Sequence, residues 1–395
     1  MYSKSVLHNL SEPRDARVLS RTMGANRARS LAAAALLGLA SLAQAHEVND
    51  QLSVGLTLFG SAQYGHFDNN IGDDDEAIGS QWGTAGGADL EVGFAPTVNN
   101  DLYARGRYVR GNGLNDQWVG GLAPWGTDLH DDHVDINDSG RSYLLEAWYR
   151  HRFDFGDGQR SLSLTAGLIN AAAFLDDNSY ADDEMVHFMN DAFVARAYMP
   201  AYDWGAGAEL DLGTVGINAV YMRSKTGDDA DRRFDYIGGQ VHYHATLGIG
   251  EGTYRLWGQL TSDDFLDTGG ERLQARRSVG ISIDQAVGEY YGLFFRSAWQ
   301  VRKAAVNYKA AYSGGVHLNG VLWGRADDEA GLGVGYLPGG NGEIANTRVS
   351  EAYVRVNINS HIDVTADLQY MKDSLRDGAP DRKAWIPGLR LVVSF

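Results

Sequence analysis

The sequence of 395 residues contains no cysteine and only seven prolines. The absence of cysteine excludes disulfides, a thiolate nucleophile and cysteine-ligated metal sites. The scarcity of proline argues against a disordered polymer rich in proline and glycine. Basic residues are also few, because 34 Lys and Arg stand against 51 Asp and Glu. This acidic balance disfavours a nucleic-acid partner, which would need a basic groove.

Long apolar runs are missing as well, so the sequence predicts no membrane-spanning helix. The longest run, residues 31–42, follows two arginines and ends in the small-residue cleavage pattern Ala43-Gln44-Ala45. A short run with these flanks is typical of a secretory signal peptide. We therefore expect a signal peptide at residues 1–45, export from a bacterial cytoplasm, and one mature domain at residues 46–395. Met23 would begin a signal of ordinary size and is an alternative start.

Glycine is abundant, with 49 residues, together with 20 Tyr, 13 Phe and 9 Trp. After the N-terminal segment, stretches of roughly ten residues alternate between apolar and polar side chains. In "IGGQVHYHATL", for example, Ile237 and Val241 share one face, and Gln240 and His242 share the other. A period of two indicates strands rather than helices. Apolar residues that would face lipid and polar residues that would face a lumen are typical of a membrane barrel.

The sequence thus predicts an all-β fold, a closed antiparallel transmembrane β-barrel with long extracellular loops and short periplasmic turns. About sixteen strands are expected, an even number as in other closed barrels of this class. We expect the strands near residues 52–66, 84–95, 101–110, 142–154, 161–170, 202–212, 214–223, 235–247, 252–261, 277–287, 290–301, 312–324, 330–337, 348–359, 361–371 and 386–395.

A soluble secreted β-protein, such as a sandwich or a propeller, is the alternative interpretation of this alternation. It is disfavoured because charged residues recur on the polar face in strand after strand. Aromatic residues also recur at the expected strand ends, as the interfacial girdles of a membrane protein require. These aromatic residues are Phe59, Tyr64, Trp82, Phe153, Tyr221, Tyr370 and Trp385.

Two stretches, residues 112–140 and 170–200, are too long for periplasmic turns. In a barrel of this size a long loop that folds inward makes a wide aqueous lumen selective. The second stretch is acidic, without the spacing of an EF-hand, so we expect no metal there. Solvated surface charge is the alternative for its acidic residues. We expect this stretch to form a constriction through Asp176, Asp177, Asn178, Asp182, Asp183, Glu184, Phe188 and Asn190.

The same stretch carries a recognisable order of residues in "AGLINAAAFLDDNSYADDEMVHFMNDAFV" (166–194). The C-terminal third adds "GLGVGYLP" (331–338), "SEAYVRVNINSHIDVTADLQYMKD" (350–373) and "WIPGLRLVVSF" (385–395). In these segments the chain resembles the carbohydrate-selective porin family (OprB-like) of Gram-negative outer membranes. The chain departs from the family in having "MKDSLRDGAP" where an Asn-Pro is usual. The resemblance implies passive diffusion of mono- or oligosaccharides through a narrow polar channel, with no cofactor.

Charged side chains on the expected lumen faces are candidates for the channel lining. Arginines and carboxylates would replace the hydrogen bonds that sugar hydroxyls make with water, and aromatic rings would contact the apolar faces of sugars. A generic solvated lumen, in which these charges pair with one another, is an equal alternative. The candidates are Glu146, Trp148, Arg150, Arg152, Arg255, Trp257, Arg296, Arg355, Asp363 and Asp367.

Two histidine pairs raise other chemistry. His130 and His133 resemble a metal clip, but a loop without supporting groups favours solvated side chains. His242 and His244 share an expected lumen face, where a barrel hydrolase would place a histidine beside Ser and Asp. No nucleophile motif accompanies them, so we expect no enzyme, and an outer-membrane hydrolase is the less favoured alternative.

The sequence therefore favours a sugar porin of the cell outer membrane. A general or cation-preferring porin remains open, because removal of residues 1–45 would leave 28 basic and 49 acidic residues, a net charge of −21. The expected partners are small carbohydrate solutes, outer-membrane lipid and lipopolysaccharide. Phe395 would be the terminal aromatic residue that the outer-membrane assembly machinery binds. A homotrimer is one possible assembly.

Overall fold

A computed structural model describes residues 46–395, apart from residues 50, 73–75, 157–159, 195–196, 228–231 and 377. The expected signal peptide and the alternative start at Met23 lie outside the described residues. Strands and loops make up most of the described chain, and its helices are short. None of the helices in this part of the chain is long and apolar enough to cross a membrane.

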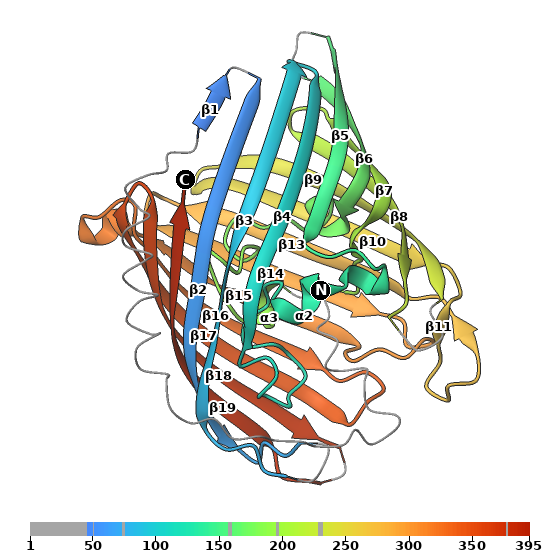
Figure 1. Ribbon diagram of the computed structural model, residues 1–395, viewed down its shortest axis with the longest axis vertical. Coiled ribbons are helices and arrows are strands. Elements are labelled where there is room, and N and C mark those ends of the chain that lie inside the picture. Colours follow the sequence, from blue (N-terminus) through green and yellow to red (C-terminus); the bar gives the residue numbers. More distant parts are fainter. Residues whose placement is uncertain are drawn as a thin grey trace.

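Within the described residues, sixteen antiparallel strands close into a ring (Figure 1). The ring closes where β19 pairs with β2, with Arg390 opposite Ser61. Leu56 and Phe395 exchange two backbone hydrogen bonds, of 3.2 and 2.9 Å, which hold the last residue in register. The predicted fold class is confirmed. The strands are β2 (Leu52–Asp68), β3 (Gln81–Thr97), β4 (Asn100–Gly113), β5 (Leu144–Phe155), β6 (Arg160–Asn170), β7 (Ala201–Asp211), β8 (Val215–Lys225), β9 (Arg233–Leu247), β10 (Gly250–Thr261), β13 (Arg277–Val287), β14 (Tyr291–Gln300), β15 (Ala310–Asn319), β16 (Glu329–Pro338), β17 (Ile344–Asn359), β18 (Ile362–Leu375) and β19 (Arg382–Ser394).

The predicted strand near 312–324 is wrong at its C-terminal end, because β15 stops at Asn319 and the 3-10 helix η4 (Gly320–Trp323) follows. The side chain of Asn319 accepts a hydrogen bond of 2.9 Å from the backbone of Val321, which starts the helix. Gly324 then reverses the chain at φ 79°, a conformation that favours glycine. Smaller strands outside the ring are β1 (His46–Asn49), beside the start of β2, and the pair β11 (Phe265–Leu266) and β12 (Leu273–Gln274).

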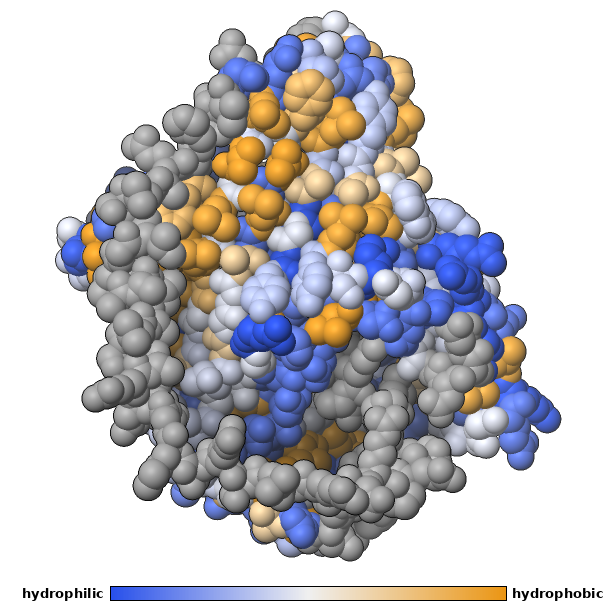
Figure 2. Space-filling view, viewed as in Figure 1, coloured by the Kyte–Doolittle hydropathy of each residue, from blue (hydrophilic) through white to orange (hydrophobic). Residues whose placement is uncertain are grey.

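The alternation along the strands separates an apolar outer face from a polar inner face. On β9, Ile237 and Val241 are 58% and 49% exposed, whereas Gln240 beside them is 2% exposed. Figure 2 shows hydrophobic side chains gathered over β2 to β5 on the visible outer face. Exposed apolar side chains outside and buried polar side chains inside are the arrangement expected of a barrel with lipid around it. Apolar side chains such as Met371 and Ile386 are also buried inside the ring, in a cluster with Phe188 and Phe193 of the β6–β7 loop.

Aromatic side chains pair across neighbouring strands on the outer face. The ring centroids of Tyr64 and Trp82 lie 5.3 Å apart, and those of Tyr370 and Trp385 lie 4.8 Å apart. Phe59 is an exception, because it is 5% exposed and contacts the inner Trp125 at 6.1 Å between centroids. The prediction that Phe59 joins an aromatic girdle is therefore wrong: its side chain has the parity of the inner face.

Two long connections fill much of the ring. The β4–β5 loop (residues 114–143) contains α2 (His130–Val134) and η2 (Ile136–Asp138). The β6–β7 loop (residues 171–200) contains η3 (Ala171–Ala173) and α3 (Asp191–Val194). Figure 1 shows α2 and α3 inside the ring of strands. The lumen is thus occupied by chain as well as by side chains of the wall.

Aromatic residues of the β6–β7 loop pack against the inner wall where the wall carries glycine. A Cβ atom on Gly207 of β7 would lie 2.1 Å from the ring of Phe174. A Cβ atom on Gly333 of β16 would lie 2.6 Å from the ring of Phe193. Both distances are too short for real contacts, so these glycines are required for the loop to approach the strands this closely.

Candidate functional site

Arg296 of β14 lies beneath the β6–β7 loop, and its side chain is 5% exposed. Its guanidinium donates to the carboxylate of Asp176 at 3.1 Å. It also donates to the backbone carbonyl oxygens of Ala181 and Phe193. A planar guanidinium can satisfy several acceptors at once, so one side chain fixes three separate points of the loop.

Arg255 of β10 makes the neighbouring attachment. It donates to Asp177 of the loop at 2.8 Å and also pairs with Asp284 of β13. Burial acts to raise the pKa of Asp177, but the guanidinium of Arg255 outweighs it and holds the pKa below its ordinary value. Asp177 is nevertheless 60% exposed, so its negative charge faces the inner space.

The middle of the loop, residues 184–190, is bound to the opposite side of the ring. Arg390 of β19 donates to the carbonyl oxygens of Glu184, Val186 and His187, at 2.8, 3.0 and 3.0 Å. Glu351 of β17 accepts the backbone N–H of Asn190 at 2.9 Å. Six strands lie between β10 and β19 in the ring, so the β6–β7 loop crosses the lumen rather than following one wall.

The β4–β5 loop lies against the β6–β7 loop and against the wall. Pro124 accepts a hydrogen bond of 2.9 Å from the side chain of Gln369. The indole N–H of Trp125 donates to the backbone carbonyl of Glu184 at 3.2 Å. Gly126 donates from its backbone to Met189 at 2.7 Å. The two loops therefore form one inward partition, where the sequence predicted at least one inward loop.

A different part of the inner wall stays partly exposed. On β5 and β7, Arg150 and Glu209 pair at 3.2 Å, with side chains 33% and 31% exposed. The guanidinium of Arg150 lies 5.0 Å from the centre of the Trp148 ring. That ring stacks on Tyr103 of β4, with centroids 5.0 Å apart. Charged and aromatic groups thus share one surface on β4, β5 and β7.

The same surface continues through Arg105 of β4. Its guanidinium lies 3.0 Å from Asp89 and 3.7 Å from Glu146, and the Arg105 side chain is 22% exposed. Sequence reasoning did not single out Tyr103 or Arg105. The signal was present, because Tyr103, Arg105 and Arg107 share one parity of the strand expected at 101–110.

The residues predicted to line or constrict the channel fall into two groups by exposure. Their roles in the channel stay a prediction. The partly exposed group contains Glu146, Trp148, Arg150, Arg152, Arg355, Asp363, Asp177, Asp182, Asp183 and Glu184. The buried group, which contacts loop or wall, contains Arg255, Trp257, Arg296, Asp367, Asp176, Asn178, Phe188 and Asn190.

The two histidine pairs differ in their surroundings. Both ring nitrogens of His133 are bonded to backbone, at 2.7 Å to the carbonyl of Leu129 and 3.2 Å to the N–H of Val109. His133 thus has no free nitrogen for a metal. His242 and His244 lie 4.9 Å apart between ring centroids, and His244 contacts Thr253 at 3.0 Å.

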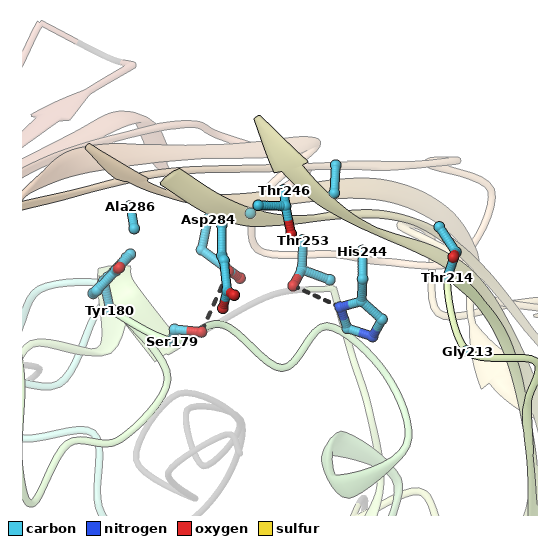
Figure 3. Close-up of a pocket in the computed structure, with 12 residues that line it drawn as sticks. Ser179, Tyr180, Gly213, Thr214, His244, Thr246, Thr253, Asp284 and Ala286 are labelled. Atoms are coloured by element: carbon cyan, nitrogen blue, oxygen red, sulfur yellow. Dashed lines mark hydrogen bonds between the residues drawn. The ribbon is translucent and has the colours of Figure 1, made fainter. Parts of the chain in front are cut away.

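A cavity of about 520 Å³ lies between the start of the β6–β7 loop and the ends of β9, β10 and β13 (Figure 3). Ser179 donates to Asp284 on one side of it at 3.3 Å, and His244 and Thr253 face it from the other side. Hydroxyl, carboxylate and imidazole groups therefore surround a space of the volume of a small ligand.

Residues 110–395 match the model of a protein family described as "Carbohydrate-selective porin, OprB family". The chain belongs to this family. The protein is accordingly an outer-membrane porin for the diffusion of carbohydrates, and the resemblance noted in the sequence is confirmed.

One relative in sequence and two solved structures resemble this chain over most of its length. An uncharacterized protein of Aquifex aeolicus (strain VF5) is 27% identical over 274 residues, which cover 69% of this chain and 75% of that protein. The high-pH structure of Pseudomonas putida OprB superposes with a TM-score of 0.68 at 13% identity, covering 87% of this chain and 94% of that one. The channel DcaP of Acinetobacter baumannii gives a TM-score of 0.52 at 11% identity, covering 89% and 99%. At these identities the solved structures show a shared fold alone.

Proposed function

We propose that sugars cross this porin along the β4, β5 and β7 side of the lumen, between that wall and the inward partition. The proposal rests on one observation, the partly exposed surface of Tyr103, Trp148, Arg150 and Glu209. Arg150 and Glu209 offer donors and acceptors to sugar hydroxyls, so water lost from the sugar is replaced at little cost. The stacked rings offer flat apolar area to the C–H faces of a sugar ring.

The experiment is sugar block of single-channel current in planar bilayers, together with liposome swelling in a series of neutral sugars. We expect Trp148→Ala to weaken sugar block by about fivefold to tenfold, since a lost stacking contact costs about 1 kcal/mol. Trp204→Ala is the matched control, because Trp204 is 64% exposed on the outer face. Equal sugar block in wild type and Trp148→Ala would contradict the proposed path.

A cation-preferring porin is the second candidate, and a specific observation favours it. Asp177 and Glu91 reach the inner space with side chains 60% and 45% exposed. A large conductance that sugars leave unchanged, with a strong preference for cations, would support this function over a sugar-selective one.

We further propose that the chain is exported by its signal peptide, contacts lipopolysaccharide and has no catalytic turnover. The alternative, hydrolysis of a lipid or peptide, predicts an activity that disappears in His244→Ala. Recognition of Phe395 by the assembly machinery predicts that deletion of this residue lowers the yield of folded protein in the outer membrane. Crosslinking in intact membranes would test for a homotrimer by the size of the product.

A further inference from the structure

Two histidines and a glutamate meet where the β6–β7 loop contacts β15 and β16. His187 comes from the loop, His317 from β15 and Glu329 from β16. One ligand atom from each residue lies within 4.8 Å of the others. Glu329 pairs with Asn319, two residues beyond His317, so His317 and Glu329 are diagonal neighbours on the inner face.

One carboxylate oxygen of Glu329 accepts a hydrogen bond, and the other accepts none from the described residues. Arg355 of β17 donates to Oε1 of Glu329 at 2.7 Å. Oε2 is buried, has no hydrogen-bond partner in the described chain, and lies 3.9 Å from Nε2 of His187. A buried carboxylate oxygen that accepts no hydrogen bond is costly, so a ligand at this point would satisfy it.

Groups around the three residues hold them in place. The hydroxyl of Tyr353 lies 3.4 Å from Nδ1 of His317, which leaves the other ring nitrogen available. Tyr180 stacks on the His317 ring, with centroids 5.1 Å apart. The backbone of His187 is fixed by Arg390. Second contacts of this kind orient histidine ligands in metal sites.

We propose that His187, His317 and Glu329 bind one divalent transition-metal ion, with Zn²⁺ as the best fit. Two imidazoles and one carboxylate oxygen are a ligand set that zinc accepts, with water in the fourth position. Calcium and magnesium are disfavoured because they require mainly oxygen ligands. Around a tetrahedral zinc with bonds near 2.0–2.1 Å, the ligand atoms lie about 3.3 Å from one another. They now lie within 4.8 Å of one another, so side-chain movements of about 1 Å would bring them to this distance.

The ion would connect the inward loop to the wall between its two other attachment regions. The β6–β7 loop is held at Arg255 and Arg296 on one side and at Glu351 and Arg390 on the other. The three proposed ligands lie on β15, β16 and the loop, between those regions in ring order. Metal binding would therefore reduce motion of the partition, which is the part that narrows the lumen.

The test uses the detergent-solubilised mature protein without a polyhistidine tag. Isothermal titration with ZnCl₂ should give one tight site per chain, and Co²⁺ substitution should give the visible absorption of a tetrahedral site. We expect His187→Ala and Glu329→Gln each to weaken zinc binding by at least about tenfold, because even the loss of a supporting residue costs that much. Glu329→Gln keeps the size of the side chain and one oxygen that can accept from Arg355, and it replaces the proposed ligand oxygen by an NH2 group that cannot bind a metal.

The double variant His242→Ala/His244→Ala is the matched control, since the rings of that pair also lie close together, with centroids 4.9 Å apart, and His244 is exposed. It should bind zinc as the wild type does. Loss of the tight site in the control, with the site retained in His187→Ala, would overturn the proposal. Absence of any stoichiometric zinc binding to the wild type would overturn it as well. Folding of each variant is checked by heat-dependent mobility on gels.

Discussion

Arg255 and Arg296 are charged side chains on lumen faces of their strands, yet they are 4% and 5% exposed because the β6–β7 loop covers them. Alternation along a strand predicted which face they occupy. Alternation could not predict their burial, because the β6–β7 loop that covers them has no regular alternation of apolar and polar residues. Asp176 is buried against Arg296, whereas Asp177 pairs with Arg255 and keeps a side chain that is 60% exposed.

Replacing Arg296 tests this attachment. In Arg296→Met, the carboxylate of Asp176 remains buried without its guanidinium partner, and the three loop carbonyls of Asp176, Ala181 and Phe193 lose their donor. Removal of one partner from a buried ion pair costs about 3–5 kcal/mol, so we expect the loop to detach and the barrel to unfold at lower temperature.

The measurements are heat-dependent gel mobility and single-channel conductance, which should rise as the lumen opens. Arg110→Met is the control, because Arg110 is exposed, has the outer-face parity of β4 and donates to Tyr108 on the same face at 2.7 Å. An Arg296→Met channel with wild-type conductance would show that the loop stays in place without this contact.

At the level of elements, the strands and the presence of an inward loop were largely predictable, and the contacts of the inner loops were not. A strand such as β13, expected at 277–287, begins and ends where it was predicted, since alternation and flanking turn residues mark both ends. The meeting of Trp125 with Glu184 joins two loops that are far apart in sequence. Such contacts depend on the shape of the closed ring, which local sequence patterns do not contain.

Substitution of a glycine on the inner wall tests how closely the β6–β7 loop packs against the strands. In Gly207→Ala the new Cβ atom would lie 2.1 Å from the ring of Phe174, so the ring has to leave its position. Overpacking of this kind typically costs about 1–3 kcal/mol. We expect a lower unfolding temperature and noisier single-channel current.

Gly239→Ala is the control within the same barrel. The nearest atom to its new Cβ would be 3.7 Å away, an ordinary contact. Equal unfolding temperatures for the two variants would contradict the proposed role of Gly207 as a space for Phe174.

At the level of the whole molecule, the chain carries a net negative charge, and the exposed carboxylate of Asp177 contributes negative charge inside the lumen. Asp177 keeps its negative charge in acid, because its pKa lies below the ordinary value of 3.8. The neighbours that act on it are Arg255, Gln240 and His242. The pairing of Asp177 with Arg255 therefore stabilises the folded protein at pH values above the ordinary pKa of the carboxyl group. This stability is lost only as the pH falls through the lower pKa that Asp177 has in the folded protein.

We expect Asp177→Asn to reduce cation preference, measured as the reversal potential in a KCl gradient. The difference between wild type and variant should persist from pH 7 down to about 4, because the lowered pKa keeps Asp177 ionised across this range. A difference that vanishes well above the ordinary carboxyl pKa would contradict the assignment of ion preference to Asp177.

The partition that crosses the ring divides the porin into two unequal sides. On β4, β5 and β7, the side chains of Tyr103, Trp148, Arg150 and Glu209 are partly exposed, so in the proposed path a substitution there changes what a passing solute contacts. On the side of β14 to β19, wall residues meet the loop, so a substitution changes how firmly the passage is held narrow. In this arrangement, solute preference and the width of the passage depend on different residues, so one can change by substitution without the other.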